Sequence, residues 1–386
     1  MKVLVFSNFY IPGFKGGGPI KTLKNLFDRT GDIISYKLIT SDRDLGDSTP
    51  YPNIQYNHWQ TLDNTDVLYI KPRTKGYISI FKTVTKNSHD LLYLNSFFSI
   101  RFSLLPLLIA KSQKKQVVLG PRGEFSEGAL SLKPLRKKIY ISFYKKLKLH
   151  NNTVFQASSL HEEEDIKKEL GDKIDVFIAE DIGSAEFAKE IPKQDSEAIK
   201  AVFISRISPK KNLLFALQAL NDVDYPLVYH IYGPVEDEDY WNQCQKLITE
   251  MPLHITVEYK GDLVPEQVIT KLSQYDFFYM PTKGENYGHV IAEALCAGLP
   301  LVISNTTPWR NLKHSGLGWD LPLDNINTFS SVINELAQMP INEHLKMRNH
   351  ILNWAKQKFT EIDAVQANIN MFNYAYKKRK GTNKNV

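Results

Sequence analysis

Short runs of apolar residues alternate with stretches of helical periodicity along much of this chain. In the segment 276–304, an apolar run over Phe277–Met280 is followed by a polar loop, a helical pattern that stops at Gly298, and a second apolar run over Leu301–Ser304. Short buried runs on either side of a helix are typical of a βαβ unit with parallel strands. Residues 201–220 predict another strand followed by a helix, whose apolar positions are spaced for one buried face.

Further elements are predicted on both sides of these segments. Strand patterns begin at residues 3, 116, 229 and 257, and helical patterns cover 329–336, 344–359 and 363–377. The polar stretch 189–200 precedes the strand at 201, so we expect it to link two domains. A chain of 386 residues with 42% hydrophobic content is long enough for two domains with separate cores.

Two glutamates lie in the first of these units, Glu285 in the polar loop and Glu293 about two turns into the helix. Between them, Asn286, Tyr287 and Gly288 lead into the helix, and Gly288 allows backbone to approach a ligand closely. A helix N-terminus beyond the carboxyl end of a parallel strand is a site for phosphate or diphosphate. Because carboxylates repel phosphate, we expect the glutamates to accept hydrogen bonds from sugar hydroxyls.

This arrangement resembles the Glu-x7-Glu signature of the retaining family 4 glycosyltransferases, which have a two-domain B-type fold. The resemblance implies that Glu285 and the backbone of Asn286, Tyr287 and Gly288 hold the donor sugar. It also implies that Glu293 holds the ribose of the nucleotide. A solvated loop and a helix surface are the alternative for two glutamates at this spacing, but the strand–loop–helix–Gly–Pro–strand order favours the functional interpretation.

A second match lies upstream, in residues 201–213. In the family, an arginine and a lysine at this spacing follow the first strand of the C-terminal domain and bind the donor diphosphate, which implies that role for Arg206 and Lys211. Arginine offers phosphate a planar fork, and lysine a mobile point charge. The family usually has glycine after this lysine, whereas this chain has Asn212, which leaves the local turn open.

The loop after the strand at 257 resembles a family loop that often contacts the nucleotide base. The resemblance implies base contacts for Gly261, Asp262 and Leu263, with Gly233 as a further candidate. Turn glycines after strands are the alternative interpretation of the same pattern.

The N-terminal half matches the family less specifically. A Gly-rich loop after the first strand resembles a loop that faces the donor in related enzymes, which implies donor contacts for Gly17 and Gly18. Arg122 and Glu124 lie in a Pro-Arg-Gly loop that many family members with lipid-linked acceptors share, so we expect them to contact donor or acceptor. A turn with solvent-facing charges is the alternative for this pair.

Other polar residues are assigned to structure. Ser159 and Glu162 form a capping box, and we expect the acidic run that follows to start a helix and face water. Cys244 and Cys296 lack the spacing of metal ligands and indicate a reducing compartment, with Cys296 packed in the core.

No metal site is predicted. The pairs Asp42/Asp44 and Asp222/Asp224 have no third ligand nearby in the sequence, and B-type transferases generally work without a bound metal.

The net charge of +6 is unevenly distributed. Residues 133–148 contain cations interleaved with aliphatic and aromatic residues and no acidic residue. Such a stretch can lie on an anionic membrane surface, and a domain helix with a solvated cationic face is the alternative. No nucleic-acid-binding motif accompanies the charge. The longest hydrophobic tract, 97–110, is shorter than the roughly 20 residues that a membrane-spanning helix requires.

We therefore expect an α/β fold of two Rossmann-like domains facing across a cleft. Residues 1–188, with 362–386 packing back onto them, form the acceptor-side domain, and residues 189–361 bind the nucleotide-sugar. The resemblance implies a cytoplasmic, metal-independent retaining glycosyltransferase without a cofactor, and the basic stretch 133–148 allows a peripheral position on the inner face of the plasma membrane. It would transfer a sugar from a nucleotide diphosphate to a lipid-linked glycan in O-antigen or capsule synthesis. The alternatives are a nucleotide-sugar epimerase, a phosphorylase, or a non-catalytic nucleotide-sugar-binding partner.

Overall fold

A computed structural model describes residues 1–71, 74–86, 88–192 and 198–382, and it divides into two compact units. Unit 1 comprises Met1–Ile182 with Ile362–Val386, and unit 2 comprises Gly183–Glu361. The backbone N–H of Ala188 donates to the Cys296 carbonyl (2.9 Å), so the chain already belongs to unit 2 before the expected linker at 189–200. Within that linker, residues 193–197 lie outside the described part of the chain.

The sheet of unit 1 is eight-stranded, in the order β3-β4-β2-β1-β5-β6-β7-β8. Neighbouring strands are parallel except β3 and β4, which form an antiparallel edge. The strands are β1 (Lys2–Phe6), β2 (Ser35–Ser41), β3 (Trp59–Leu62), β4 (Thr65–Ile70), β5 (Leu91–Leu94), β6 (Val117–Leu119), β7 (Thr153–Ala157) and β8 (Val176–Ile178).

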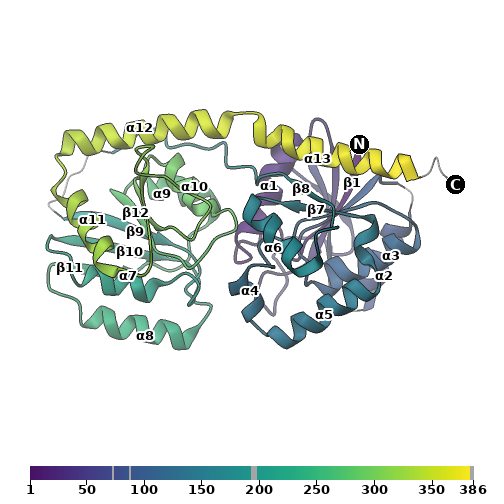
Figure 1. Cartoon of the computed structure of the whole chain (residues 1–386), viewed down its shortest axis with the longest axis horizontal. Coiled ribbons are helices and arrows are strands. Elements are labelled where there is room, and N and C mark those ends of the chain that lie inside the picture. The colour runs from purple at the N-terminus through teal and green to yellow at the C-terminus, as the bar shows by residue number, and fades with distance from the viewer. Residues whose placement is uncertain (72–73, 87, 193–197, 383–386) are drawn as a thin grey trace. The chain divides into compact units, whose positions relative to one another are not determined.

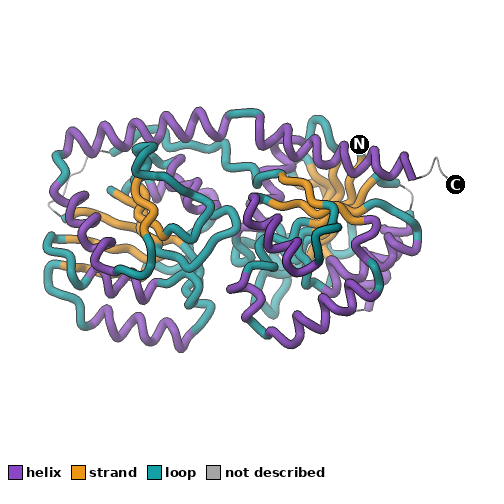
Figure 2. The backbone as a smooth tube through the Cα atoms, viewed as in Figure 1, coloured by secondary structure: helices purple, strands orange, loops and turns teal. Residues whose placement is uncertain are grey.

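Helices cover both faces of this sheet, which makes it a three-layer α/β unit (Figures 1 and 2). Ile80, Ile141 and Ile166 from α2, α5 and α6 pack into the core on one face. Leu23 of α1 and Phe372 of α13 pack on the other. The helices are α1 (Gly18–Thr30), α2 (Thr74–Thr85), α3 (Leu105–Ser112), α4 (Glu127–Ser131), α5 (Pro134–Lys146), α6 (Leu160–Leu170) and α13 (Asp363–Thr382).

The C-terminal helix α13 therefore belongs to the N-terminal unit, as the resemblance implied. The Phe372 ring meets the edge of Tyr93 on β5, with ring centroids 5.2 Å apart. The Asn368 side chain also donates to the carbonyl of Glu180 (2.8 Å), just after β8. Within the described residues, no helix combines the length and the apolar character needed to cross a membrane.

The sheet of unit 2 is six-stranded and parallel, in the order β11-β10-β9-β12-β13-β14. In chain order this is the 3-2-1-4-5-6 arrangement of a dinucleotide-binding fold, and its strand order reverses between β9 and β12. Ligands of such sheets bind beyond the carboxyl ends of the strands at that reversal. The strands are β9 (Ile199–Ile204), β10 (Leu227–Tyr232), β11 (Ile255–Tyr259), β12 (Phe277–Met280), β13 (Leu301–Ser304) and β14 (Gly318–Leu321).

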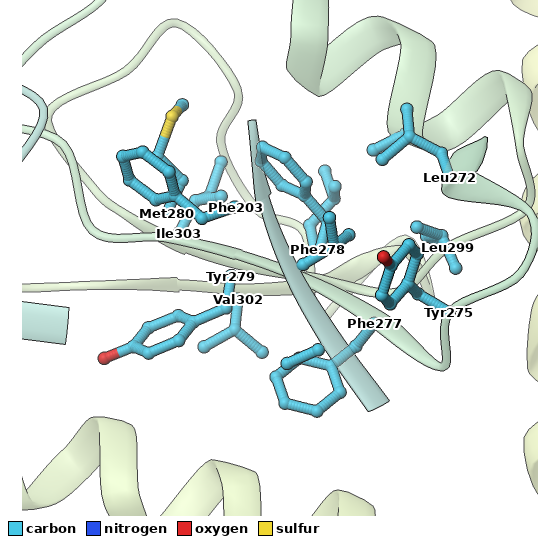
Figure 3. Packing of buried hydrophobic residues seen from close by; sticks show 14 of the residues in the cluster. Phe203, Leu272, Tyr275, Phe277, Phe278, Tyr279, Met280, Leu299, Val302 and Ile303 are labelled. Atoms are coloured by element: carbon cyan, nitrogen blue, oxygen red, sulfur yellow. The ribbon is translucent and has the colours of Figure 1, made fainter. Parts of the chain in front are cut away.

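The strand β12 shows why the apolar run at its position forms a buried strand. Side chains alternate between the two faces of a sheet. Figure 3 shows Phe277 and Tyr279 on one side of β12 and Phe278 and Met280 on the other. All four are fully buried, because helices cover both faces. These helices are α7 (Leu213–Leu220), α8 (Glu238–Thr249), α9 (Val268–Leu272), α10 (His289–Cys296), α11 (Ile326–Gln338) and α12 (Ile341–Thr360).

Candidate functional site

The loops after β9 and β12 meet at the strand-order reversal of unit 2. The Nζ atom of Lys211 lies 2.6 Å from Oε1 of Glu285, and both side chains are largely buried. The hydroxyl of Thr282 donates to the same carboxylate oxygen (3.2 Å). The structure therefore brings together two residues that the sequence placed in separate motifs.

Hydrogen bonds between the two loops fix this meeting point. The backbone N–H of Lys283 donates to the Lys210 carbonyl (2.9 Å), and the side-chain amide of Asn212 donates to the Pro281 carbonyl (2.9 Å). Asn212 has φ 61°, a left-handed conformation that glycine adopts freely and asparagine tolerates. The asparagine thus accommodates the turn at the start of α7 and adds a bond to the neighbouring loop.

Arg206 lies nearby but in a different environment. Its guanidinium is half exposed and pairs with Glu236, after β10, at 2.7 Å. Partial removal from water lowers the pKa of Lys210, and the charges of Lys211 and Arg206 add to this effect while Glu285 opposes it. The carboxyl edge of unit 2 therefore gathers Arg206, Lys210 and Lys211 near one another.

The loops after β10 and β11 lie beside the loop after β9, at the same edge of the sheet. A Cβ atom on Gly233 would lie 2.1 Å from the Ser205 carbonyl oxygen, so only glycine fits against the loop that carries Arg206. The N–H of Gly233 donates to the carbonyl of Gly261 (2.9 Å), which has φ 74° and open space around it. Asp262 is exposed and Leu263 is half buried against the core.

Residues 281–288, which follow β12 and which we call the donor loop, continue into α10. Gly288 has φ 81° and precedes the helix, while Asn286 and Tyr287 are half buried. Glu293 is 7% exposed on α10. Burial raises the pKa of the neighbouring Cys296 thiol, and the charge of Glu293 adds to this effect. Glu285 thus belongs to the loop, whereas Glu293 is fixed within the helix.

In unit 1, the predicted glycine loop lies between β1 and α1. Gly17 has φ 69° and precedes α1, which starts at Gly18. The backbone N–H groups of Phe14 and Lys15 both donate to Oδ2 of Asp44, at 2.7 and 3.0 Å. Asp44 is therefore a structural residue that holds the loop. Among the described residues, no group of three His, Cys, Asp or Glu side chains is arranged to hold a metal ion.

Arg122 is not a solvent-facing charge on a turn. Its side chain is 6% exposed and forms an ion pair with Asp181 at 2.5 Å. It also donates to the side chains of Tyr93, Asn95 and Gln156. Burial opposes its charge, but Asp181, Tyr93 and Glu162 together outweigh that effect and raise the pKa of Arg122. The guanidinium thus joins the loop after β6 to neighbouring strands and to the end of unit 1.

Glu124 is likewise not solvent-facing. Its carboxylate accepts hydrogen bonds from the Ser96 hydroxyl (2.7 Å) and from the backbone N–H groups of Phe97 (2.5 Å) and Phe98 (3.0 Å). Burial raises the pKa of Glu124 in spite of these donors. The side chain therefore fastens the loop after β6 to the loop after β5.

The expectation that the acidic run after Ser159 faces water is wrong for Glu162, which is 4% exposed. The Ser159 hydroxyl does cap α6 by accepting from the Glu162 N–H (3.2 Å). The Glu162 carboxylate turns inward and accepts from the N–H groups of Gly123 (2.6 Å) and Ser158 (2.8 Å). This residue supports the Pro-Arg-Gly loop, a role that only the fold reveals.

Known proteins with similar sequence or structure have the same architecture. Residues 184–357 match the family model described as glycosyl transferases group 1, whereas no curated protein matches the sequence. HepE from Anabaena, solved in complex with UDP and glucose, is 16% identical with a TM-score of 0.71, covering 97% of this chain and 99% of that one. Sucrose-phosphate synthase from Thermosynechococcus elongatus is 14% identical with a TM-score of 0.69, over 97% and 98% of the two chains.

A third similar structure is WaaG, a glycosyltransferase involved in lipopolysaccharide biosynthesis. It is 11% identical with a TM-score of 0.68, over 96% of this chain and 99% of WaaG. The similar structures share the two-domain B-type glycosyltransferase fold, and unit 2 carries the group 1 domain. The chain therefore has this fold, and its match to the glycosyl transferases group 1 model covers residues 184–357.

Proposed function

We propose that the protein is a retaining, metal-independent transferase that moves a sugar from a nucleotide diphosphate to a lipid-linked glycan in bacterial surface polysaccharide synthesis. The observation that carries this proposal is the contact between Lys211 and Glu285 at the strand-order reversal of unit 2. A cation for the diphosphate and a carboxylate for sugar hydroxyls then lie side by side, as a donor with both groups requires. Involvement of WaaG in lipopolysaccharide biosynthesis supports the acceptor class.

In the proposed reaction, the bond from the anomeric carbon to the diphosphate oxygen breaks while a bond to the acceptor hydroxyl oxygen forms on the same face of the sugar. The hydroxyl proton passes to the departing diphosphate, so no protein base is assigned. Lys211, Arg206 and the N-terminus of α10 stabilise the negative charge of the leaving group. Stabilisation of such developing charge is usually the largest catalytic term.

The positions of the two glutamates support the donor roles that we propose for them. Glu293 is assigned to the ribose and is fixed within α10, while Glu285 is assigned to the sugar and lies in the preceding loop. Asn286, Tyr287 and Gly288 complete the sugar side. Gly261, Asp262 and Leu263 are assigned to the base.

In unit 1, Gly17 and Gly18 are assigned to the donor, and Arg122 with Glu124 to the acceptor side. Because Arg122 and Glu124 are engaged within unit 1, their part is to shape the loop that meets substrate.

A thermal-shift screen with UDP-, GDP-, ADP- and CMP-sugars tests donor binding, because a ligand selective for the folded state raises the melting temperature. Transfer to an acceptor distinguishes the proposal from its rivals. Turnover of donor alone would indicate an epimerase, dependence on inorganic phosphate a phosphorylase, and binding without turnover a non-catalytic partner.

We predict that the two glutamates separate sugar binding from nucleotide binding. Glu293→Gln should weaken binding of the free nucleotide and of the nucleotide-sugar alike, because both contain the ribose. Glu285→Gln should spare the free nucleotide and lower transfer by about a hundredfold, the usual scale for one lost stabilising group. Calorimetry with nucleotide and intact donor measures both effects. Loss of nucleotide binding in Glu285→Gln alone would reverse the assignments.

We further propose that the outer surface of α5 contacts an anionic membrane, where a lipid-linked acceptor would lie. Leu135, Ile139 and Phe143 follow one another at helical spacing and are 70%, 62% and 45% exposed. Ile141 and Tyr144 of the same helix are buried in the core, so α5 is apolar on two sides. An exposed apolar patch rimmed by charge marks an interaction surface. The rim consists of exposed Lys133, Arg136, Lys138, Lys145, Lys146 and Lys148.

A further inference from the structure

The loop that carries Glu285 is held by a segment that the sequence motifs do not include. We call residues 304–309, which follow β13, the anchor segment. Its Ser304 and Thr306 hydroxyls both donate to the carbonyl of Thr282, the latter at 2.7 Å. The two hydroxyl oxygens lie 2.9 Å from each other. The anchor segment thus fixes the start of the donor loop.

Trp309 fixes the other end of the donor loop. Its indole Nε1–H donates to the carbonyl of Tyr287 at 2.6 Å. Its ring meets the Tyr287 ring edge-on, with centroids 5.7 Å apart, and lies 6.1 Å from Phe359 of α12. Thr307 is buried and accepts from the Trp309 N–H (3.3 Å), which constrains the turn that presents the indole.

The ring of Tyr287 is confined on a further side as well. A Cβ atom on Gly183 would lie 3.1 Å from the Tyr287 hydroxyl oxygen and 2.7 Å from Cδ1 of Phe359. Gly183, Tyr287 and Phe359 therefore pack against one another, and any larger residue at 183 would disturb them. Tyr287 has little room to move while the indole holds its carbonyl.

Glu285 lies between the two carbonyls that the anchor segment holds. Its carboxylate accepts from Lys211 and from the Thr282 hydroxyl, which belongs to the fixed start of the loop. A backbone carbonyl bonded to an indole N–H at 2.6 Å is a specific restraint, because tryptophan offers this single donor. The position of the carboxylate therefore depends on bonds that come from outside the loop.

We propose that Trp309 is a positioning residue of the donor site. Its indole N–H holds the donor loop in place. The proposal rests on the proposed function, since Glu285 is taken to bind the sugar. Glu293 lies within α10, outside the loop whose carbonyl the indole holds. Loss of the N–H should therefore affect sugar recognition and transfer while leaving nucleotide binding intact.

The test compares Trp309→Phe with Trp354→Phe in the full-length chain. Phenylalanine retains an aromatic ring but lacks the N–H. Trp354 packs against the same Phe359, with centroids 6.3 Å apart, so its replacement controls for loss of an indole in this cluster. Kd values for UDP and UDP-glucose, or for the pair that the thermal-shift screen selects, are measured together with kcat and KM.

In Trp309→Phe we expect UDP affinity within about twofold of wild type. The preference for UDP-glucose over UDP, and kcat, should each fall about tenfold, the scale of one lost hydrogen bond. Trp354→Phe should change neither the preference for UDP-glucose over UDP nor kcat. Thr306→Val, which removes one of the two hydroxyl donors at the Thr282 carbonyl without altering the aromatic cluster, should act in the same direction and serves if Trp309→Phe does not fold.

The remaining outcomes overturn either the positioning role or the proposed function. An unchanged sugar preference in both Trp309→Phe and Thr306→Val overturns the positioning role. Equal losses for UDP and UDP-glucose reduce Trp309 to a structural residue and also overturn it. If the wild-type protein binds no nucleotide-sugar, the proposed function itself fails and the inference fails with it.

Discussion

Among single residues, the two cations assigned to the diphosphate differ in their surroundings. Lys211 and Glu285 have side chains only 13% and 12% exposed, whereas those of Arg206 and Glu236 are 36% and 42% exposed. A pair as exposed as the second contributes at most about 1 kcal/mol to stability. Removing one member of a largely buried pair leaves the other charge without compensation, which costs considerably more.

We therefore predict that Arg206→Ala and Lys211→Ala have similar effects on catalysis but different effects on stability. Both should lower the transfer rate by about a hundredfold or more, as loss of one charge-stabilising group does. Arg206→Ala should leave the free energy of unfolding within about 1 kcal/mol of wild type. Lys211→Ala should lower it by about 1–3 kcal/mol, because the Glu285 carboxylate loses its main partner. Urea unfolding and steady-state rates measure the two effects.

A double variant separates the contribution of Lys211 to stability from its contribution to transfer. Lys211→Met combined with Glu285→Gln removes both charges and leaves no uncompensated carboxylate, so stability should return toward wild type while transfer remains lost. Near-normal transfer in both Arg206→Ala and Lys211→Ala, with folding confirmed by circular dichroism, would refute the diphosphate role. Equal stability of Arg206→Ala and Lys211→Ala would instead refute the argument from burial.

Single-residue environments were the least predictable feature from sequence. The chain suggested Glu285 and Lys211 as site residues through motif order, but their direct contact depends on pairing of β9 with β12. Arg122 and Asp181 are far apart in the sequence, so nothing local indicated a buried ion pair. Glu162 looked like an ordinary first-turn acid because its partner Gly123 also lies on a distant segment.

Among the elements, α12 is joined to the sheet of unit 2 by buried polar groups. His344 lies 3.0 Å, through Nε2, from the Asp276 carbonyl oxygen, which places the proton on Nε2. Arg348 donates to the carbonyls of Gly298 (3.1 Å) and Ser273 (2.8 Å). Burial lowers the pKa of His344, and the charge of Arg348 adds to this effect while Asp276 opposes it. Burial therefore favours the neutral form of His344 in the folded state.

We predict that this histidine makes stability depend on pH. The unfolded chain binds a proton at His344 near pH 6.5, the ordinary value, whereas the folded chain does so only at lower pH. Below about pH 6.5 the unfolded state thus binds more protons, and stability falls as pH falls, by at most about 1.4 kcal/mol per pH unit. Urea unfolding between pH 7.5 and pH 5.5 measures this slope in wild type and in His344→Gln.

The variant isolates the contribution of His344 from that of other groups. Burial raises the pKa of Asp276, which favours the folded state as pH falls and so acts in the opposite direction. Asp276 remains in both proteins, and the charge of His344 lowers its pKa, so the difference between their slopes reports the histidine together with its interaction with Asp276. A slope that is as steep in His344→Gln as in wild type would show that His344 does not titrate differently on folding.

Element patterns were informative where strands and helices had clear boundaries. The apolar run after Gly298 and Pro300 predicted β13, because glycine often ends a helix and proline often precedes a new element. The helix predicted at 344–359 begins earlier, at Ile341, because Pro340 precedes its first turn. The strands between residues 35 and 94 were not predicted, since short apolar runs do not distinguish a strand from part of a buried helix.

In the molecule as a whole, charge and exposed apolar surface coincide on the outer side of α5. The sequence predicted a basic amphipathic stretch but not which cations point outward. Lys137 donates to the Ala129 carbonyl (2.5 Å), and its Nζ lies 5.0 Å from the centroid of the Phe98 ring, so it faces the protein. Lys138, Lys145, Lys146 and Lys148 are exposed. These four residues are the ones to change in testing the proposed membrane surface.

We predict that the protein sediments with vesicles containing anionic lipid, and that salt weakens this binding. Replacing Lys138, Lys145, Lys146 and Lys148 by Gln should abolish it, since each cation near an anionic surface contributes about 1 kcal/mol. The matched control replaces the exposed unit 2 residues Lys246, Lys346, Lys356 and Lys358 by Gln, which gives the same change in net charge. Leu135→Ser with Ile139→Ser should weaken binding at high salt, where the apolar contact dominates. Equal sedimentation of both lysine variants would show that α5 carries only a solvated cationic surface.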